Sequence, residues 1–504
     1  MARTTRSGRR SPLSATPSCV TRSAGSPKRA IRSRQCLPAA VRDANLGIEN
    51  GTAGRKSRPK TTGGNAVIKI FAAALALSLA ISSVATAQTG KVTVVTSFAK
   101  DVTDPFKKAF EKAYPGATLE VQNRNTNAAV KFIEETKANN QIDLMWASAP
   151  DAFEVLKGKS LLQKYQPKAV GIPDKVGSYP INDPGGTYLG FAASGYGIMW
   201  NDRYMKANKI PEPAEWQDLA KAVYFDHVAI ASPARSGTTH LTVETILQGE
   251  GWEKGWRTIK ELAGNFRQIT DRSFDVPEQV NSGQVGIGIV IDFFAFSAKA
   301  SGFPVKFAYP SVTTVVPANI GIVANAPNKA GAEAFVEFLL SPVGQEVLLD
   351  PGIRRLPINP AVYAKAPADY PNPFKDPRFQ KMITFSAETS ESRTAVVDTL
   401  FDQLISFQLA ALKDVTKTLH EVDAALAKKD NAQARTLAKE ARDLVAAMPL
   451  TAQQASSKEI TGAFTGAKEK GARQAELEQQ WAAFAKERYT QAKTKASDAL
   501  KLAR

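Results

Sequence analysis

Between residues 91 and 146 the apolar positions switch repeatedly between the alternation typical of a strand and the spacing typical of a helix. The run from Lys91 to Ser97 alternates in β-branched residues, which predicts a strand, and apolar residues then recur at helical spacing from Asp101 to Tyr114. A strand over 117–122, a helix over 128–137 and a strand over 142–146 are predicted next. Strands and helices that alternate at this spacing predict parallel β/α units, with an open sheet covered by helices.

The loops that follow these strands are the expected ligand contacts, because open sheets of this type bind ligands beyond the carboxyl ends of their strands. The loops lie at 96–98, 124–127 and 147–151. The candidate binding residues in them are Ser97, Asn127 and Ser148.

The rest of the pattern predicts two lobes with a cleft between them. An apolar run at 188–200 is long enough to connect two lobes, a second β/α set extends over about 201–301, and a connector over 305–323 brings the chain back. The predicted fold class is therefore α/β, with two open sheets joined by hinge strands. Lobe 1 is expected over 88–195 with 305–370, and lobe 2 over 196–304.

From residue 371 to 504 the sequence is rich in Ala, Lys, Glu and Gln and predicts a C-terminal helical extension. Apolar residues from Ile405 to Leu426 recur at steps of three and four, a second helix is expected to end near Met448, and a third covers about 472–502. The extension is either a helical appendage packed on itself and on one lobe, or a docking surface for a membrane sensor or an importer.

Charge and cysteine are concentrated near the N-terminus. The 504-residue chain has a formal net charge of +17, but residues 1–64 alone hold 14 Lys or Arg against two acids. From Gln88 onward the balance is 50 to 46, so the main body lacks the basic clustering that a nucleic-acid-binding protein needs. Both cysteines, Cys19 and Cys36, precede this point, which excludes a disulfide scaffold, a cysteine zinc site and a thiol nucleophile in the main body.

An apolar run that ends in Ala85-Thr-Ala87 is typical of a signal peptide, predicted over 66–87, and thus of export to the periplasm. A transmembrane anchor is the alternative, but the apolar part after Lys69 is shorter than the ~20 residues that a span needs. Residues 1–65 have no apolar period and are expected to be a disordered basic leader. This leader is either a nucleic-acid-binding arm or the product of a wrongly assigned start, with translation beginning at Val67.

A turn between a predicted strand at 228–231 and a predicted helix at 239–248 is the strongest candidate for anion binding. It consists of Arg235, Ser236, Gly237, Thr238 and Thr239. Free backbone N–H groups and the helix dipole favour an anion at a helix N-terminus. The three hydroxyl groups add donors, the glycine lets the backbone approach closely, and the arginine can bind two oxygens at once. The alternative is an ordinary helix cap with a solvated arginine.

Longer motifs carry a resemblance to a known family. They are Ser232-Pro-Ala-Arg-Ser-Gly-Thr-Thr239, Gly251-Trp-Glu-Lys-Gly-Trp256, Phe307-Ala-Tyr-Pro-Ser311 and the stretch 326–345. Over about residues 90–365 the chain resembles the extracellular solute-binding proteins of bacterial ABC importers, in the branch that holds ferric-ion, hexose-phosphate, phosphonate and phosphoglycerate binders. The resemblance implies a monomer that binds a small anionic solute in the interlobe cleft, with an ABC permease in the inner membrane as partner. Phosphoglycerate binders of the family are linked to a sensor system, which adds a membrane sensor kinase as a candidate partner.

Asp292 ends a predicted strand at 285–291 and is therefore expected to project toward the cleft. Ferric binders of the family present a tyrosine pair just after the corresponding strand, whereas this chain has Phe293 and Phe294, which cannot coordinate iron. An aspartate suits a hydroxyl or ammonium group on an organic ligand, although it also suits a helix cap. We therefore expect a phosphorylated small metabolite, with ferric iron as the alternative, and no cofactor or resident metal.

Catalytic motifs are lacking in the sequence, so the chain is predicted not to be an enzyme. Gly286-Ile-Gly288 lacks the third glycine of a dinucleotide fingerprint, and no G-x-S-x-G occurs. The three histidines, His227, His240 and His420, are not spaced as a metal set, and none pairs obviously with a serine nucleophile. His240 is expected at the surface. A secreted hydrolase is the alternative that these observations disfavour.

Overall fold

One mixed sheet runs through the part of the chain that the structure, a computed structural model, describes: residues 90–464 and 471–504. The predicted leader at 1–65 and the predicted signal peptide at 66–87 lie outside these residues. The sheet has the strand order β2 (Ala117–Asn123), β1 (Gly90–Thr96), β3 (Leu144–Ala147), β12 (Val315–Val323), β7 (Leu189–Asn201), β10 (Ile287–Ile291), β8 (Val228–Ala231) and β9 (Phe266–Thr270). Strands β4 (Leu162–Gln163), β11 (Val305–Ala308) and β13 (Leu356–Pro357) pair beside this path.

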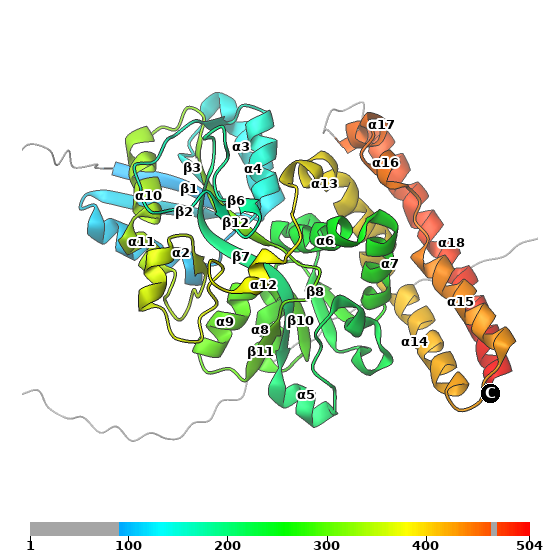
Figure 1. Cartoon of the computed structure of the whole chain (residues 1–504). Helices are drawn as coiled ribbons and strands as arrows, with labels where there is room; N and C mark the ends of the chain where they lie inside the picture. Colours follow the sequence, from blue (N-terminus) through cyan, green and yellow to red (C-terminus); the bar gives the residue numbers. More distant parts are fainter. Residues whose placement is uncertain (1–89, 465–470) are drawn as a thin grey trace, which may run out of the picture. The chain divides into compact units, whose positions relative to one another are not determined.

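Strand β7 belongs to both halves of the sheet (Figure 1), and all 13 of its residues are buried. Its partner changes in the middle, because Gly195 lies opposite Val315 of β12 while the next residue, Tyr196, lies opposite Ile291 of β10. We call the part built on β1–β4, β12, β13 and the start of β7 lobe 1, and the part built on β8–β11 and the end of β7 lobe 2. The predicted two-lobe α/β fold is confirmed, but the two expected sheets are one continuous sheet because they share β7.

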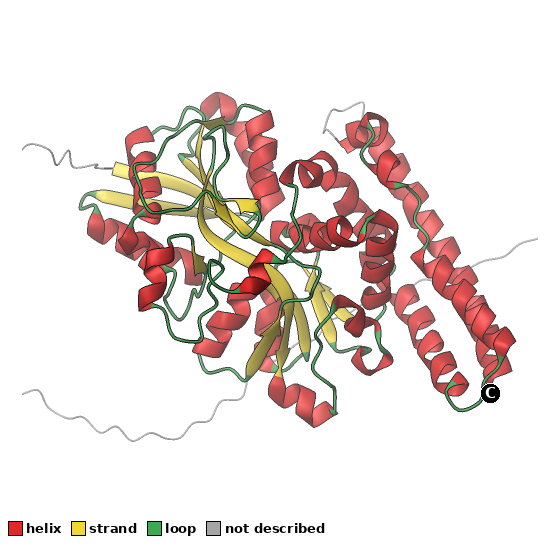
Figure 2. Cartoon of the chain, viewed as in Figure 1, coloured by secondary structure: helices red, strands yellow, loops and turns green. Residues whose placement is uncertain are grey.

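Helices cover both faces of the sheet (Figure 2). Those of lobe 1 are α2 (Lys100–Ala113), α3 (Thr126–Thr136), α4 (Pro150–Gly158), α10 (Lys329–Leu340) and α11 (Pro342–Val347). Phe106 and Phe110 are four residues apart in α2, so they share one face of the helix, and both are buried. Trp146 on β3 meets Phe106 edge-on at 5.4 Å and Phe335 of α10 at 5.5 Å, which gives lobe 1 an aromatic core.

Lobe 2 shares its hydrophobic core with the C-terminal extension. Its helices are α5 (Asp202–Asn208), α6 (Gly237–Glu250), α7 (Trp252–Ala263), α8 (Asp275–Ser282) and α9 (Asp292–Ala300). The buried side of α7 forms one apolar cluster with α14 (Leu409–Leu426), α15 (Ala432–Ala446) and α18 (Gly471–Ala503), and α15 lies alongside α18 (Figure 1). The indole of Trp252 donates to the Leu450 carbonyl at 2.9 Å. These three helices of the extension thus pack on each other and on lobe 2.

The helices of the extension begin at Ala387, later than the predicted start at residue 371. Residues 371–386 hold only the single-turn α12 (Pro377–Gln380), and Phe379 and Phe385 are buried in the core of lobe 1. Helix α13 (Ala387–Phe401) then leads through a π-helical turn (Asp402–Ser406) into α14. Among the described residues no single helix is long and apolar enough to cross a membrane. One pair of consecutive helical segments, 387–406 and 409–426, reaches that length and composition when the two are taken together, but the pair is bent by 61°.

Candidate functional site

A cavity lies where the strand ends of the two lobes meet. Lobe 1 lines it with the loops after β1, β2 and β3, through Ser97, Phe98, Asn125, Thr126 and Ser148. Lobe 2 lines it with the turn before α6 and the start of α9, through Arg235, Ser236, Gly237, Thr238, Phe293 and Phe294. The cavity therefore occupies the place that the open-sheet architecture predicts, beyond the carboxyl ends of the strands.

Four helices begin at the wall of this cavity. The N-cap residues of α2, α3 and α6, which are Ala99, Asn125 and Ser236, all line it, as does Phe293 in the first turn of α9. A helix N-terminus has free backbone N–H groups and a partial positive charge of roughly half an elementary charge. Four such ends around one space create an electrostatic environment that favours an anion.

Arg355 adds a buried positive charge to the cavity wall. Its side chain is 1 % exposed, and its Nη2 donates to Ser148 Oγ at 2.7 Å. Its Nε and Nη1 are buried and have no hydrogen-bond partner within the described residues. The guanidinium lies between two rings, with its carbon 4.6 Å from the centre of Phe98 and 4.0 Å from the centre of Phe293. The rings restrain the plane of the guanidinium.

The charge of Arg355 persists at neutral pH in spite of its burial. Burial lowers the pKa of Arg355 to about 10, and the Asp292 carboxylate acts in the opposite direction. A buried cation with unpaired donors is unfavourable, because the desolvation of each donor is not compensated. An anion that accepts from these nitrogens would offset that cost through charge-assisted hydrogen bonds.

The backbone on both sides of Arg355 fixes its position. Its N–H donates to the Leu348 carbonyl at 3.1 Å, and its carbonyl accepts from the Tyr370 hydroxyl at 2.6 Å. Strand β13 starts at the next residue and pairs with β7. Arg355 is not among the residues predicted from the sequence. The available signal was its position between Ile353 and Leu356, two apolar residues that the structure buries completely.

Six of the nine residues predicted from the sequence line the cavity: Ser97, Ser148, Arg235, Ser236, Gly237 and Thr238. Their contact with a ligand stays a prediction. Arg235 is half-exposed and already paired, with its Nη1 2.6 Å from Asp271 Oδ1. Water screens the charge of a half-exposed side chain, so the attraction between Arg235 and an anion is weaker than that of the buried Arg355.

Asn127 and Thr239 lie outside the cavity and stabilise the turn instead. The Asn127 amide donates to the Ala234 carbonyl at 3.1 Å and to Asp398 Oδ2 at 3.2 Å. The buried Thr239 hydroxyl donates to Ser236 Oγ at 3.1 Å, and the same oxygen accepts from the Thr239 N–H at 3.2 Å. Ser236 therefore acts as the N-cap of α6 as well as lining the cavity.

Asp292 is buried behind the cavity instead of projecting into it. Its Oδ2 accepts from the Gly195 N–H and the Tyr309 hydroxyl, both at 2.7 Å, and its Oδ1 accepts from the Phe293 N–H at 2.7 Å. Burial raises the pKa of Asp292 to about 6, although these hydrogen bonds oppose the shift. Gly195 marks the point where β7 passes between the lobes. Asp292 therefore joins this strand to the start of α9, and its position differs from the predicted one because these donors hold it.

His240 is also placed differently from the prediction. It is 1 % exposed, its Nδ1 lies 2.7 Å from Asp398 Oδ1, and its Nε2 lies 2.9 Å from Ser390 Oγ. The order Ser–His–Asp is that of a hydrolase triad. Burial lowers the pKa of His240, but the carboxylates of Asp398 and Asp151 outweigh it and raise the pKa to about 9. An imidazolium cannot take the proton of Ser390, which is itself fully buried.

An aromatic wall extends the cavity. Phe293 and Phe294 lie with ring centres 4.3 Å apart, at the place where the family resemblance puts metal-binding tyrosines. A second hollow shares Ala99, Val102, Phe274, Phe293 and Phe294 with the cavity, so the aromatic surface continues beyond it. Within the described residues no group of three or more His, Cys, Asp or Glu side chains is arranged to hold a metal ion.

Known proteins share this architecture and part of the sequence. Residues 139–375 match the family described as bacterial extracellular solute-binding protein. The phosphoglycerate transport regulatory protein PgtC of Salmonella typhimurium is 31% identical over 313 residues, which are 62% of this chain and 76% of that protein. The chain belongs to the bacterial extracellular solute-binding proteins.

Solved structures of other solute-binding proteins have the same fold. The periplasmic binding protein AfuA from Actinobacillus pleuropneumoniae matches with a TM-score of 0.57 at 22% identity, over 63% of this chain and 98% of that chain. Iron-bound HitA from Pseudomonas aeruginosa matches with a TM-score of 0.51 at 15% identity, over 61% of this chain and 98% of that chain. The similar proteins are solute-binding proteins and not enzymes, and the family implies a solute ligand and a membrane permease as partners.

Proposed function

We propose that this solute-binding protein takes up a small organic anion, with a phosphate ester as the preferred head group, and delivers it to the permease of an ABC importer. The observation that carries the proposal is the buried Arg355, whose Nε and Nη1 have no partner among the described residues and lie where four helices begin. A phosphate presents several oxygens and up to two negative charges, which suits a guanidinium together with backbone N–H groups.

The head group would lie between Arg355 and the turn that starts at Ser236. The hydroxyl groups of Ser97 and Thr238 line the same space and supply further donors. The remainder of the solute would lie against the rings of Phe293 and Phe294, which continue into the neighbouring hollow. A short phosphorylated carbon skeleton fits this division into a cationic end and an aromatic wall.

Two relatives support a phosphorylated solute. PgtC is named for phosphoglycerate transport, and the AfuA structure contains fructose-6-phosphate. Ferric iron is the alternative, since HitA binds iron on the same fold. Phe293 and Phe294 offer a metal no oxygen, and this difference favours the organic anion over ferric ion.

A thermal-shift panel tests the choice of solute. The panel contains 3-phosphoglycerate, glucose 6-phosphate, aminoethylphosphonate, unphosphorylated glycerate and ferric citrate, with citrate alone as the control for the last. We expect stabilisation by one or more of the phosphorylated compounds and none by glycerate at the same concentration. Stabilisation by ferric citrate but by no phosphorylated compound would refute the proposal.

Export and signalling complete the proposal. Cleavage after Ala87 would release a periplasmic protein that begins at Gln88, and N-terminal sequencing of the exported material tests this.

A second candidate function is presentation of the solute to a membrane sensor kinase, which the name of PgtC as a regulatory protein favours. Deletion of the gene should then abolish solute-dependent transcription as well as solute uptake. Loss of uptake alone would leave only the transport function.

A further inference from the structure

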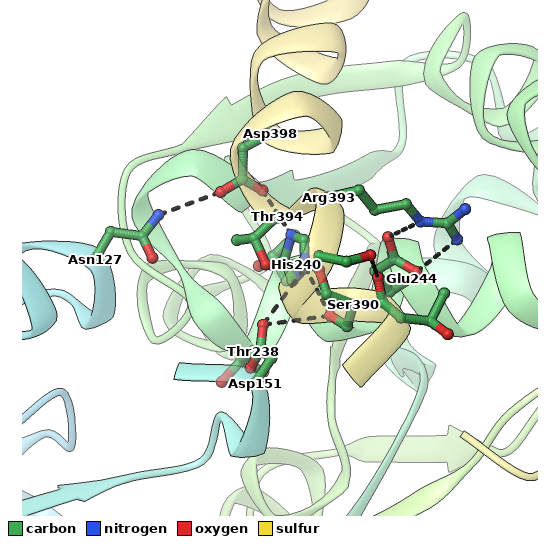
Figure 3. Close-up of polar contacts among 12 residues, drawn as sticks. Asn127, Asp151, Thr238, His240, Glu244, Ser390, Arg393, Thr394 and Asp398 are labelled. Carbon is green, nitrogen blue, oxygen red and sulfur yellow. Dashed lines mark hydrogen bonds and ion pairs between the residues drawn. The ribbon is translucent and has the colours of Figure 1, made fainter. Parts of the chain in front are cut away.

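Helix α13 contacts both lobes at once. It packs against α4 of lobe 1, and against α6 and the turn of lobe 2 that holds Arg235. Figure 3 shows the polar part of this junction, where Asp151 comes from α4, His240 from α6, and Ser390 and Asp398 from α13. We propose that α13 is a strap across the two lobes, and that Asp398 is a positioning residue that holds them together through His240 and Asn127. This inference goes beyond solute binding and does not depend on which solute is bound.

The imidazolium of His240 lies at the centre of the junction. Its Nδ1–H donates to Asp398 Oδ1 at 2.7 Å and its Nε2–H donates to Ser390 Oγ at 2.9 Å. The Ser390 hydroxyl in turn lies 3.4 Å from Asp151 Oδ2, and His240 Nε2 lies 3.5 Å from the same oxygen. One cation of lobe 2 is therefore shared by a carboxylate of lobe 1 and a carboxylate of the extension, with all four side chains buried.

Asp398 also contacts lobe 1 through its second oxygen. Oδ2 accepts from the Asn127 amide at 3.2 Å, and the same amide donates to the Ala234 carbonyl of the turn before α6 at 3.1 Å. A single carboxylate thus bonds His240 of lobe 2 and Asn127 of lobe 1. Substitution of Asp398 should loosen both lobes at the same point.

Separation of the lobes would break the contacts of the Asp151 carboxylate. Burial raises the pKa of Asp151, and the nearby His240 cation opposes that shift. The other oxygen of Asp151, Oδ1, has no hydrogen-bond partner within the described residues, so His240 and Ser390 provide the polar contacts of Oδ2. Both contacts run from lobe 1 to lobe 2 or to the extension, so they oppose separation of the lobes.

The strap is attached more firmly to lobe 2 than to lobe 1. The guanidinium of Arg393 on α13 bonds both oxygens of Glu244 on α6 at 2.9 Å, and both side chains are buried (Figure 3). Asp402, just after α13, accepts from the Ser232 hydroxyl of lobe 2 at 3.3 Å. If the lobes move apart, α13 should therefore stay with lobe 2, and the contacts to Asp151 and Asn127 should break.

Distances between spin labels on the two lobes test the strap without any solute. Both cysteines of the chain lie at Cys19 and Cys36, so Cys19→Ser and Cys36→Ser give a background for labelling. The labels are placed at Lys131→Cys on α3 and Lys206→Cys on α5, because both lysine side chains are 74% exposed. Double electron–electron resonance then gives the distribution of interlobe distances in the full chain.

The test variants in this background are Asp398→Asn and Asn127→Ala. Asp402→Asn is the matched control, because it makes the same change next to α13 at a residue that bonds lobe 2. We expect both test variants to increase the population at longer distances at least several-fold, and the control to keep the parent distribution. A lowered melting temperature with unchanged distances in Asp398→Asn and Asn127→Ala would overturn the proposal. If Asp398→Asn does not fold, the exposed Asn127→Ala decides by the same criterion.

Discussion

The guanidinium of Arg355 lies 4.0 Å from the centre of the Phe293 ring. The ring restrains the plane of the cation, and its face attracts the positive charge. Phe293 occupies the position at which the family resemblance puts a metal-binding tyrosine. At this position the chain therefore has no phenolate oxygen for a metal, and a buried cation lies beside the ring instead. This pairing is the physical reason to expect an anion in the cavity.

Gly237 of lobe 2 lies close to lobe 1. A Cβ built there comes within 2.9 Å of the Ala149 Cβ and of the Thr126 Oγ1 in lobe 1. Gly237→Ala should keep the lobes apart and weaken solute binding. The control is Gly158→Ala, since a Cβ there has no atom within 4 Å. Small-angle scattering should show a larger radius of gyration for the first variant, and equal radii would contradict the prediction.

The three histidines should titrate in two separate ranges. Burial lowers the pKa of His240, but Asp398 and Asp151 outweigh it and raise the pKa to about 9, whereas burial lowers the pKa of His227 and His420 from 6.5. His240 thus contributes stability that is complete below about pH 6.5 and is lost as the pH rises through about 9.

Nitrogen-detected NMR of the histidine rings measures these values directly, and His240→Gln assigns the resonance. The charged neighbours of His240 include Glu244 on the same helix, which also favours the imidazolium and is itself paired with Arg393. A His240 ring that loses its proton below pH 7 would contradict the junction described above.

Lys260 should make stability depend on pH in the opposite direction. It is 1 % exposed, its ammonium group donates to the Ala447 carbonyl at 2.8 Å, and burial lowers its pKa from 10.5 to about 7. The unfolded chain binds this proton more readily than the folded protein does. The free energy of unfolding therefore falls as the pH drops from 10.5 to about 7. Lys260→Met should raise the free energy of unfolding by roughly 2–4 kcal/mol at pH 6 and by little at pH 10. Urea denaturation at the two pH values measures the difference, and equal gains would argue against a buried, uncharged lysine.

Most of the fold could be predicted because its signals are local. The predicted strand at 228–231 agrees with the structure to the residue. The start of the extension could not be predicted in this way. Phe379 and Phe385 are buried in the core of lobe 1 by residues far away in the sequence, and this contact delays the first helix of the extension to Ala387.

Residues of the candidate site could be predicted only where they directly follow a strand of the sheet. Ser97 and Ser148 follow parallel strands, and the topology brings them to the cavity. Arg355 enters through the pairing of β13 with β7, a long-range contact that its apolar neighbours alone do not reveal. Asp292 ends the expected strand, but its direction depends on donors from Gly195 and Tyr309 that the sequence does not reveal.

Calorimetric titration with 3-phosphoglycerate tests the central claim most directly, in the wild type and in Arg355→Lys and Arg235→Ala. Lysine keeps the charge at position 355 but loses the planar set of donors and the stacking on Phe293. Loss of a buried, charge-assisted contact costs about 2–5 kcal/mol, so Arg355→Lys should weaken binding by roughly 30-fold or more. Arg235→Ala should weaken it less than about tenfold, because Arg235 is half-exposed and paired with Asp271. The reverse order, with Arg355→Lys binding like the wild type, would contradict the assignment of Arg355 as the anion-binding residue.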